Sequence, residues 1–201
     1  MPPEVDATVV TVTWNSQSVI QGFLESVPAA MGGLSWQLVV ADNASGDATV
    51  EIIRSTMPAA RLVQVGRNAG YAAGINTAVA VSDHGTDLLI ANPDVRLDSG
   101  SGKILIEALS QPAVGIAVPQ LRDVDEHLTF SIRRDPTVLR ALGEAVLGGD
   151  RAGRWASLGE TVTRHEAYER PTDVDWASGA IMAVSRQCAE SLGCWDETMW
   201  L

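Results

Sequence analysis

The 201-residue chain has few of the residues from which disulfide and zinc sites are built. It contains two cysteines, Cys188 and Cys194, and three histidines, His84, His127 and His165. The cysteines lie close together in a chain that has no disulfide framework, and no histidine stands at ligand spacing from them. We therefore expect reduced thiols and no zinc site.

Long apolar runs and positive charge are also scarce. No run approaches the roughly 18 apolar residues of a membrane-spanning helix, and the N-terminus, MPPEVDATVV, lacks the basic start of a signal peptide. The 14 Lys and Arg are outnumbered by 25 Asp and Glu, for a formal net charge of -11. This charge excludes an overall electrostatic footprint for nucleic acid. We expect a soluble cytoplasmic protein. An acidic protein can still bind phosphorylated ligands, but through a local metal ion or a few arginines.

The chain does have a regular alternation of strand and helix patterns in its first two thirds, and at 46% hydrophobic residues it has material for a core. Continuous or β-branched apolar runs alternate with segments whose apolar residues follow helical spacing. The predicted strands are 7–14, 36–41, 61–65, 87–91 and 114–119, and the predicted helices are 17–27, 47–57, 69–82 and 99–110. We expect Asn15 or Ser16 to cap the first helix. This order predicts an α/β fold with a mainly parallel sheet and helices on both faces.

The pattern loosens after about residue 120. We expect a strand at 127–134, a helix at 137–147, a mobile loop at 148–172, a strand at 174–185 broken at Ser178-Gly179, and a helix at 186–192. We therefore divide one domain into two halves, 1–120 and 121–201. The apolar ending at Leu201 lacks the polar character of most termini and predicts a truncated chain.

Polar clusters follow four of the predicted strands. They are Thr13-Trp14-Asn15-Ser16, Asp42–Asp47, Arg67–Tyr71 and Asn92-Pro93-Asp94. Each alone is equally typical of an ordinary turn or helix cap. Because the carboxyl ends of parallel strands meet at one edge of a sheet, the four together indicate a ligand site there.

The standard phosphate and nucleophile motifs do not fit this edge. There is no G-x-x-x-x-G-K-[ST], no complete G-x-G-x-x-G and no G-x-S-x-G. What remains is an acidic rim. Asp42 and Asp94 are suited to hydrogen-bond a base or a ribose and to ligate a hard cation together with phosphate oxygens.

Six motifs in register resemble the family-2 glycosyltransferases, and in particular the bacterial rhamnosyltransferase-like subgroup. They are VVTVTWNS, VVADNASGDAT, GRNAGYAAGINTAV, LLIANPDVRL, DWASGAIMAVSR and GCWDE, and the resemblance covers essentially the whole chain. It implies a GT-A fold (Rossmann-like) and inverting transfer of a sugar from a dTDP- or UDP-sugar. The implied acceptor is a cell-envelope glycan or a lipid-linked glycan. It also implies Mg²⁺ or Mn²⁺ as cofactor.

The same resemblance implies the roles of particular residues. The nucleotide and donor would be bound by Thr13, Asn15, Asp42, Asn68, Gly70, Asn92 and Asp94. Asp42 would contact the base, and Asp94 would be the metal ligand. Because position 92 is Asn, only one strong ligand is present, so metal should bind weakly until the diphosphate adds its oxygens. The sugar and acceptor side would hold Trp176, Ser178 and Gly179. Arg133 and Arg134 either approach the diphosphate or are solvated surface residues.

The catalytic base is the part of the resemblance that this chain lacks. The family base is the Asp of a Glu-Asp pair several residues beyond the W-D-E motif, and here the sequence ends four residues after Trp195-Asp196-Glu197. Asp196 and Glu197 are the remaining candidates.

Three alternatives follow. The first is an active transferase that works at or near the cytoplasmic face of the membrane, with peripheral membrane association. The second is a nucleotide-sugar-binding fragment without turnover. The third is a sugar-1-phosphate nucleotidyltransferase, which usually shows a Gly-rich basic loop after the first strand that is absent here. The oligomeric state stays open.

Overall fold

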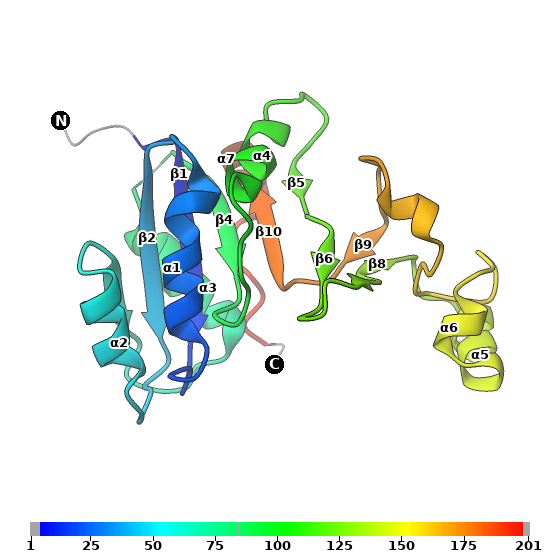
Figure 1. The fold of residues 1–201 in the computed structure, drawn as a ribbon, viewed down its shortest axis with the longest axis horizontal. Helices are drawn as coiled ribbons and strands as arrows, with labels where there is room; N and C mark the ends of the chain where they lie inside the picture. The colour runs from blue at the N-terminus through cyan, green and yellow to red at the C-terminus, as the bar shows by residue number, and fades with distance from the viewer. Residues whose placement is uncertain (1–4, 84, 199–201) are drawn as a thin grey trace. The chain divides into compact units, whose positions relative to one another are not determined.

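A six-stranded sheet organises the larger of the two compact units in this computed structural model, which describes residues 5–83 and 85–198 (Figure 1). Unit 1 comprises Met1–Val118 and Ala180–Leu201, and unit 2 comprises Pro119–Gly179. The strand β10 (Ile181–Val184) therefore returns to the sheet of unit 1 after the chain has formed unit 2. The predicted division of one domain into the halves 1–120 and 121–201 is not tested by these units and stays a prediction.

The sheet has the order β3-β2-β1-β4-β10-β5. Four strands pair in parallel: β1 (Ala7–Thr13), β2 (Trp36–Asp42), β3 (Arg61–Gln64) and β4 (Asp87–Ala91). β10 lies antiparallel between β4 and β5 (Ile116–Ala117). The predicted α/β class with a mainly parallel sheet is confirmed. The fifth predicted strand, 114–119, shrinks to two residues.

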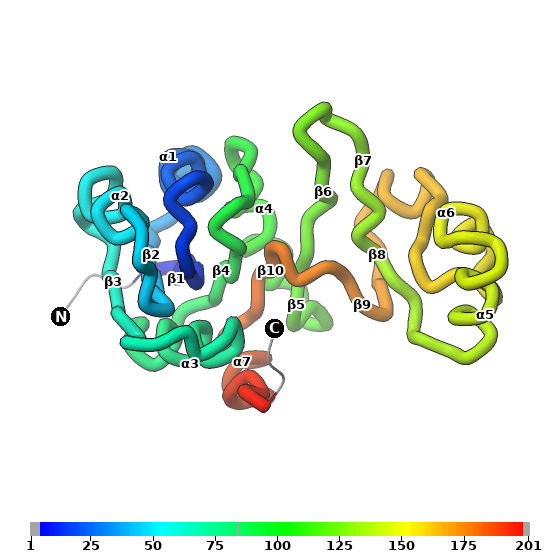
Figure 2. Tube along the Cα trace, turned by 90° about the horizontal axis from the view of Figure 1, so that it is seen from below, coloured from blue at the N-terminus to red at the C-terminus, as the bar shows by residue number. Residues whose placement is uncertain are grey.

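Helices cover both faces of this sheet (Figure 2). One face is covered by α1 (Ile20–Met31), α2 (Thr49–Thr56) and α4 (Ser101–Ala108), and the other by α3 (Tyr71–Val81) and α7 (Arg186–Leu192). Alternate strand residues supply the core on the α3 side, where Val10, Val12, Val39 and Ile90 pack with Ile75. Successive residues of a strand point to opposite faces of the sheet, and here both faces are buried.

The helix α3 approaches the sheet very closely, as its small residues predict. A Cβ added to Gly74 would lie 2.5 Å from Cγ1 of Val12 on β1, which is closer than any real contact. Gly74 is therefore required for the spacing between α3 and β1.

The first helix differs from its prediction at both ends. Its N-cap is Val19, without a side-chain hydrogen bond, because Ser16 accepts the Val19 and Ile20 N–H groups through its backbone carbonyl. Neither Asn15 nor Ser16 caps the helix by its side chain, so that prediction is wrong. The helix continues through Pro28 to Met31, where Ala30 and Met31 are fully buried.

Unit 2 is built from short elements. Two short antiparallel pairs join β6 (Leu121–Arg122) with β7 (Leu128–Thr129) and β8 (Ile132–Arg133) with β9 (Trp176–Ala177). The predicted strand 127–134 is thus two strands. The helix α5 (Val138–Leu147) confirms the predicted helix at 137–147, and Thr137 caps it by accepting the Arg140 N–H.

The segment 148–172, predicted as a mobile loop, contains short helical elements. It contains α6 (Gly149–Ala152) and a 3₁₀ turn, η1 (His165–Tyr168). Its glycines allow close backbone packing, since a Cβ on Gly159 would lie 2.4 Å from the carbonyl carbon of Ala152. At Gly159, the lack of a side chain thus permits close backbone contact.

Candidate functional site at the carboxyl edge of the sheet

The four polar clusters follow the carboxyl ends of β1, β2, β3 and β4, which lie at one edge of the sheet because the strands are parallel. Thr13 and Asp42 are paired in the register of β1 and β2, and Asp42 is paired with Gln64 of β3. The prediction that the clusters share one rim therefore agrees with the topology of the sheet.

Asp42 is the buried centre of this rim, with no exposed surface. Its Oδ1 accepts hydrogen bonds from Oγ1 of Thr13 at 2.9 Å and from Oγ of Ser45 at 2.5 Å. Its Oδ2 accepts the Ser45 N–H at 3.0 Å. Three donors satisfy a buried carboxylate that would otherwise be costly to desolvate. Asp42 thus fixes the loop that follows β2.

The same loop is tied to the loop after β1. The Asn15 N–H donates to Oγ of Ser45 at 2.9 Å, and the Gly46 N–H donates to Oδ1 of Asn15 at 2.8 Å. Asn15 has a φ of 50°, in the left-handed region that Asn tolerates better than most side chains. Asn15 therefore holds two rim loops together by donating to Ser45 and accepting from Gly46.

A further amide joins the rim to the start of α3. Nδ2 of Asn43 donates to the Gly70 carbonyl at 3.0 Å, and Oδ1 of Asn68 accepts the Gly70 N–H at 3.2 Å. Oδ1 of Asn43 is buried and has no hydrogen-bond partner among the residues that the structure describes. Gly70 has a φ of 87°, so this turn into α3 favours glycine. Asn68 and Gly70 thus lie in the same network as Asp42 and Asn15.

The Asn92-Pro93-Asp94 segment turns the chain at the end of β4. The Asn92 N–H donates to the Ala180 carbonyl at 2.8 Å, and the Asn92 carbonyl accepts the Val95 N–H at 3.3 Å. The Asp94 side chain is exposed. Within residues 5–83 and 85–198 its carboxylate has no hydrogen-bond or ion-pair partner, whereas its backbone carbonyl accepts a long bond from Arg96. Asp94 is thus a carboxylate with both oxygens available.

Tyr71, at the first position of α3, lies close enough to the Asn92-Pro93-Asp94 segment for the charge of Asp94 to act on its hydroxyl. Its hydroxyl is buried and has no partner among the described residues. Burial, and then the negative charge of Asp94, raise the pKa of Tyr71 to about 12. The sequence prediction did not include Tyr71, Asn43 or Ser45 as site residues. Their only signal was their place in the polar clusters.

Asp42 and Asp94 therefore differ in what they can bind. Asp42 has its oxygens occupied inside the protein, and Asp94 has free oxygens at the surface. A hard divalent cation takes carboxylate oxygens together with substrate oxygens. The donor set at Asp94 fits such an ion as a single strong ligand, with the Asn92 amide two residues before it.

The predicted catalytic carboxylates have hydrogen-bond partners of their own. Oδ1 of Asp196 accepts the Thr198 hydroxyl at 2.7 Å and the Thr198 N–H at 2.9 Å, and these bonds hold its pKa below the ordinary value. Oε1 of Glu197 accepts Nδ2 of Asn76 on α3 at 2.8 Å. A carboxylate with a lowered pKa is a weaker base, so the geometry does not favour Asp196 in that role.

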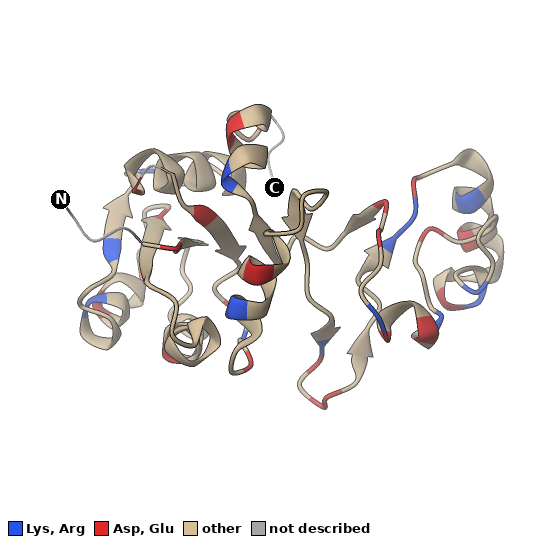
Figure 3. Ribbon diagram, turned by 90° about the horizontal axis from the view of Figure 1, so that it is seen from above, with Lys and Arg blue, Asp and Glu red and all other residues tan. Residues whose placement is uncertain are grey.

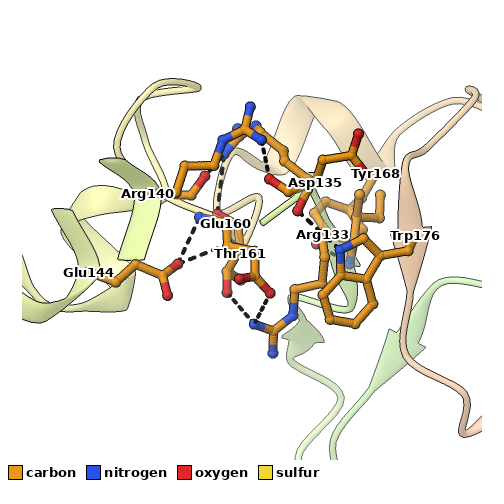
Figure 4. Close-up of polar contacts among 11 residues, drawn as sticks. Arg133, Asp135, Arg140, Glu144, Glu160, Thr161, Tyr168 and Trp176 are labelled. Carbon is orange, nitrogen blue, oxygen red and sulfur yellow. Dashed lines mark hydrogen bonds and ion pairs between the residues drawn. The ribbon is translucent and has the colours of Figure 1, made fainter. Parts of the chain in front are cut away.

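Trp176, Ser178 and Gly179 lie in unit 2, at and just after β9. Nε1 of Trp176 donates to the Arg134 carbonyl at 3.0 Å, and the Arg133 guanidinium lies over the indole ring at 5.6 Å from its centroid (Figure 4). The Ser178 N–H donates to the Ser131 carbonyl at 3.0 Å. Trp176 is 42% exposed. One indole face is therefore already used by a cation–π contact.

Arg133 and Arg134 are anchored within unit 2. Nη1 of Arg133 donates to Oγ1 of Thr161 at 2.8 Å, and Nη1 of Arg134 donates to the Gly159 carbonyl at 2.7 Å. Desolvation, and then the nearby charge of Arg140, lower the pKa of Arg134. The structure thus gives both arginines a structural role that neither alternative in the sequence prediction described.

Unit 2 also brings together three groups that can bind metal. Asp123, Asp125 and His127 place one ligand atom each within 4.8 Å of one another in the exposed turn between β6 and β7. Contacts inside the turn account for the cluster, because Oδ1 of Asp123 accepts the N–H groups of Asp125 and His127, each at 2.9 Å. This group was not predicted, and it belongs to unit 2, whereas the clusters at the sheet edge belong to unit 1.

Two solved structures have the same fold. The mannosyltransferase PcManGT from Pyrobaculum calidifontis, in complex with GDP-Man and Mn²⁺, matches with a TM-score of 0.62 and 20% identity over 98% of this chain and 49% of that chain. S. aureus TarS 1-349, in complex with UDP, matches with a TM-score of 0.52 and 19% identity over 67% of this chain and 39% of that chain. The predicted GT-A fold is confirmed.

Sequence relatives agree with the structural ones. The N-acetylglucosaminyl-diphospho-decaprenol L-rhamnosyltransferase of Mycobacterium tuberculosis is 31% identical over 204 residues. That match covers 96% of this chain, which spans 66% of the length of the relative. The family model described as glycosyl transferase family 2 matches residues 8–179. On this match the chain belongs to glycosyl transferase family 2.

Proposed function

We propose that this chain is the donor-binding part of an inverting, metal-assisted glycosyltransferase. The donor is a dTDP- or UDP-sugar, and the acceptor is a lipid-linked or cell-envelope glycan. The observation that supports this most is the free carboxylate of Asp94 at the exit of β4, on the edge where the other three strand-end clusters are joined by hydrogen bonds. The rhamnosyltransferase relative, whose name specifies a diphospho-decaprenol acceptor, supports the acceptor class.

In this proposal the residues at the carboxyl edge of the sheet have different roles in binding the donor. Thr13, Asn15, Asn68 and Gly70 line the nucleotide pocket through the loops that they shape. Asp42 acts on the base through the loop that it holds, because its oxygens are already occupied. Trp176, Ser178 and Gly179 belong to the sugar and acceptor side.

Asp94, with Asn92, would hold Mg²⁺ or Mn²⁺ together with the donor diphosphate. When bound, the ion supplies positive charge that stabilises the departing diphosphate. A single exposed carboxylate binds such an ion weakly by itself, so metal affinity should depend on bound nucleotide.

A second candidate is a nucleotide-sugar-binding module without turnover. The observation that favours it is the engagement of Asp196 and Glu197 by Thr198 and Asn76, which leaves neither as a free base. Inverting transfer needs a group that accepts the proton of the acceptor hydroxyl. A donor-turnover assay separates the two candidates: transfer supports the enzyme, and binding without transfer supports the module.

Calorimetry with UDP and dTDP, with and without Mn²⁺, tests the proposed site. We expect metal to strengthen nucleotide binding at least tenfold, and Asp94→Ala to remove that difference. Asp98→Ala is the matched control, because Asp98 is an exposed carboxylate in the same connection between β4 and α4. Equal nucleotide affinity with and without metal would contradict the proposal. An Asp94→Ala variant that keeps the metal effect would contradict the role of Asp94.

A further inference from the structure

Arg96 ties the turn that carries Asp94 to the first helix. Its Nη2 donates to the Val19 carbonyl at 2.9 Å, 77 residues away along the chain. Its Nη1 donates to the Val95 carbonyl at 3.1 Å and to the Asp94 carbonyl at 3.5 Å. All three acceptors are backbone oxygens, which the forked guanidinium can bridge. The Asp94 carboxylate takes part in none of these bonds, so it keeps its oxygens free.

The face of α1 under this arginine is made of small residues. A Cβ added to Gly22 would lie 2.5 Å from Cζ of Arg96, so the guanidinium lies where a side chain would otherwise be. Ser26 and Ala29 follow on the same side of the helix, because residues three or four positions apart are neighbours on a helix surface. Small residues at such spacings also bring membrane helices together. None of the described helices is long and apolar enough to cross a bilayer. In this chain the small residues admit the connection between β4 and α4.

The rest of that connection is attached to the same face of α1. The Leu97 N–H donates to Oγ of Ser26 at 3.2 Å, and the Gly100 N–H donates to the Ala29 carbonyl at 3.0 Å. Arg96 is thus the first of three attachments along α1, and it is the one beside the turn that carries the proposed metal ligand.

Val19 connects Arg96 to the nucleotide side of the proposed site. The Val19 N–H donates to the Ser16 carbonyl at 3.0 Å. Ser16 directly follows Asn15, which holds the loops after β1 and β2 together. Hydrogen bonds through Arg96 therefore connect these two loops with the turn that follows β4.

We infer that Arg96 is a positioning residue for donor binding, which fixes the Asp94 carboxylate relative to the nucleotide loops so that one nucleoside diphosphate reaches both. The inference rests on the proposed function, because it takes Asp94 as the metal ligand and the loops as the nucleotide site. A ligand that spans two fixed points loses less conformational freedom in the protein when it binds. Metal and nucleotide then strengthen each other's binding. Loss of Arg96 should weaken this mutual effect and leave the binding of nucleotide alone unchanged.

The charge of Arg96 acts in the opposite direction to its positioning. Acidic residues outnumber basic ones and are spread over both units (Figure 3), so the field of the chain as a whole attracts cations. Removing a positive charge near Asp94 would by charge alone strengthen the binding of a divalent cation. Weaker metal binding after removal of Arg96 therefore reports positioning and not charge.

Calorimetry with UDP and dTDP on the full chain, with and without Mn²⁺, measures how much metal strengthens nucleotide binding. In Arg96→Met we expect this factor to fall from at least tenfold to less than about threefold, with nucleotide affinity in the absence of Mn²⁺ unchanged. Gly22→Ala should lower the factor too, because its methyl group displaces the guanidinium while the charge stays. Arg54→Met is the matched control, because Arg54 is an exposed arginine on α2, and it should behave like the parent.

The double variant Gly22→Ala/Arg96→Met and urea unfolding distinguish positioning from a general structural effect. Once Arg96 is gone, the new methyl group has no guanidinium to displace, so the double variant should have the factor of Arg96→Met alone. Alanine has a higher helix propensity than glycine, so Gly22→Ala should unfold at no lower urea concentration than the parent. A merely structural role would not remove the metal effect from a variant whose stability is undiminished.

Two results would overturn the inference and leave the proposed function standing. The first is an Arg96→Met variant in which metal strengthens nucleotide binding as much as in the parent. The second is a double variant in which Gly22→Ala causes its full loss again, because that loss would not act through Arg96. If metal does not strengthen nucleotide binding in the parent, the proposed function fails and the role of Arg96 fails with it.

Discussion

Tyr71 carries a buried hydroxyl that feels the charge of Asp94, a carboxylate without a partner among the residues that the structure describes. A phenol in that position favours its neutral form, because burial and the charge of Asp94 both oppose a second negative charge. Asp42 shows the opposite case on the same rim, since three donors satisfy it. Sequence reasoning identified both carboxylates, but it could not show which one had free oxygens, because that depends on Ser45 and Thr13 meeting Asp42 in space.

The titration of Tyr71 gives a prediction at this scale. Below pH 10 the phenol is protonated in both the folded and the unfolded chain, so Tyr71 adds no pH dependence there. Between pH 10 and about 12 the unfolded chain loses the proton first, so the free energy of unfolding falls as pH rises. Tyr71→Phe should therefore flatten the dependence of the urea midpoint on pH in this window.

Removing the charge of Asp94 tests whether this carboxylate contributes to the raised pKa of Tyr71. The chain has two tyrosines, so tyrosinate absorbance of Tyr71→Phe reports Tyr168 alone and the difference reports Tyr71. Asp94→Asn should lower the pKa of Tyr71, because it removes a nearby negative charge. An unchanged titration in Asp94→Asn would show that the carboxylate does not act on the hydroxyl.

At the scale of elements, the strands and helices of unit 1 were the most predictable part. Continuous apolar runs and four-residue spacing located β1 to β4 and the helices between them, because this sheet is buried on both faces. Unit 2 was predicted less well. Its strands are two residues long, and two residues are too few for a period to show. The glycines of 148–172 looked like loop residues, although Gly153 and Gly159 serve close packing.

The contact between α3 and β1 gives a prediction for an element pair. Gly74→Ala should destabilise the protein by about 1–3 kcal/mol, because the new methyl group overlaps Val12 and forces α3 away from the sheet. Gly149→Ala is the matched control: it is a helical glycine with nothing within 4 Å of its Cβ position. Urea unfolding of both variants measures the difference. Equal stability of the two would mean that α3 does not depend on this close approach.

For the whole molecule, family and fold were predictable from six degenerate motifs in register, most of which mark the end of a strand or the start of a helix. The return of the segment after Gly179 to unit 1 was not visible in the sequence. It depends on β10 pairing with β4 and β5, which residue patterns do not reveal. The clusters that we propose bind the donor lie in unit 1, and Trp176, Ser178 and Gly179 lie in unit 2.

This division predicts where nucleotide affinity resides. Replacing 119–179 by a short Gly-Ser linker should leave Mn²⁺-dependent UDP or dTDP binding within about threefold of the parent, because Ala117 and Ala183 are already neighbours in the sheet. Calorimetry on the shortened chain measures it, and thermal unfolding shows whether the chain is folded. A folded shortened chain that has lost nucleotide binding would place part of the nucleotide site in unit 2.

The late return of β10 also bears on how the protein is made. On the ribosome, β4 emerges with one side unpaired, and it stays so until 181–184 have been synthesised. The Asn92 N–H meets its acceptor, the Ala180 carbonyl, only then. Pairings between distant segments form slowly, and an uncovered strand edge invites association with other chains. The turn that carries Asp94 should therefore be among the last features to become ordered, and a chain halted inside unit 2 should aggregate through the edge of β4.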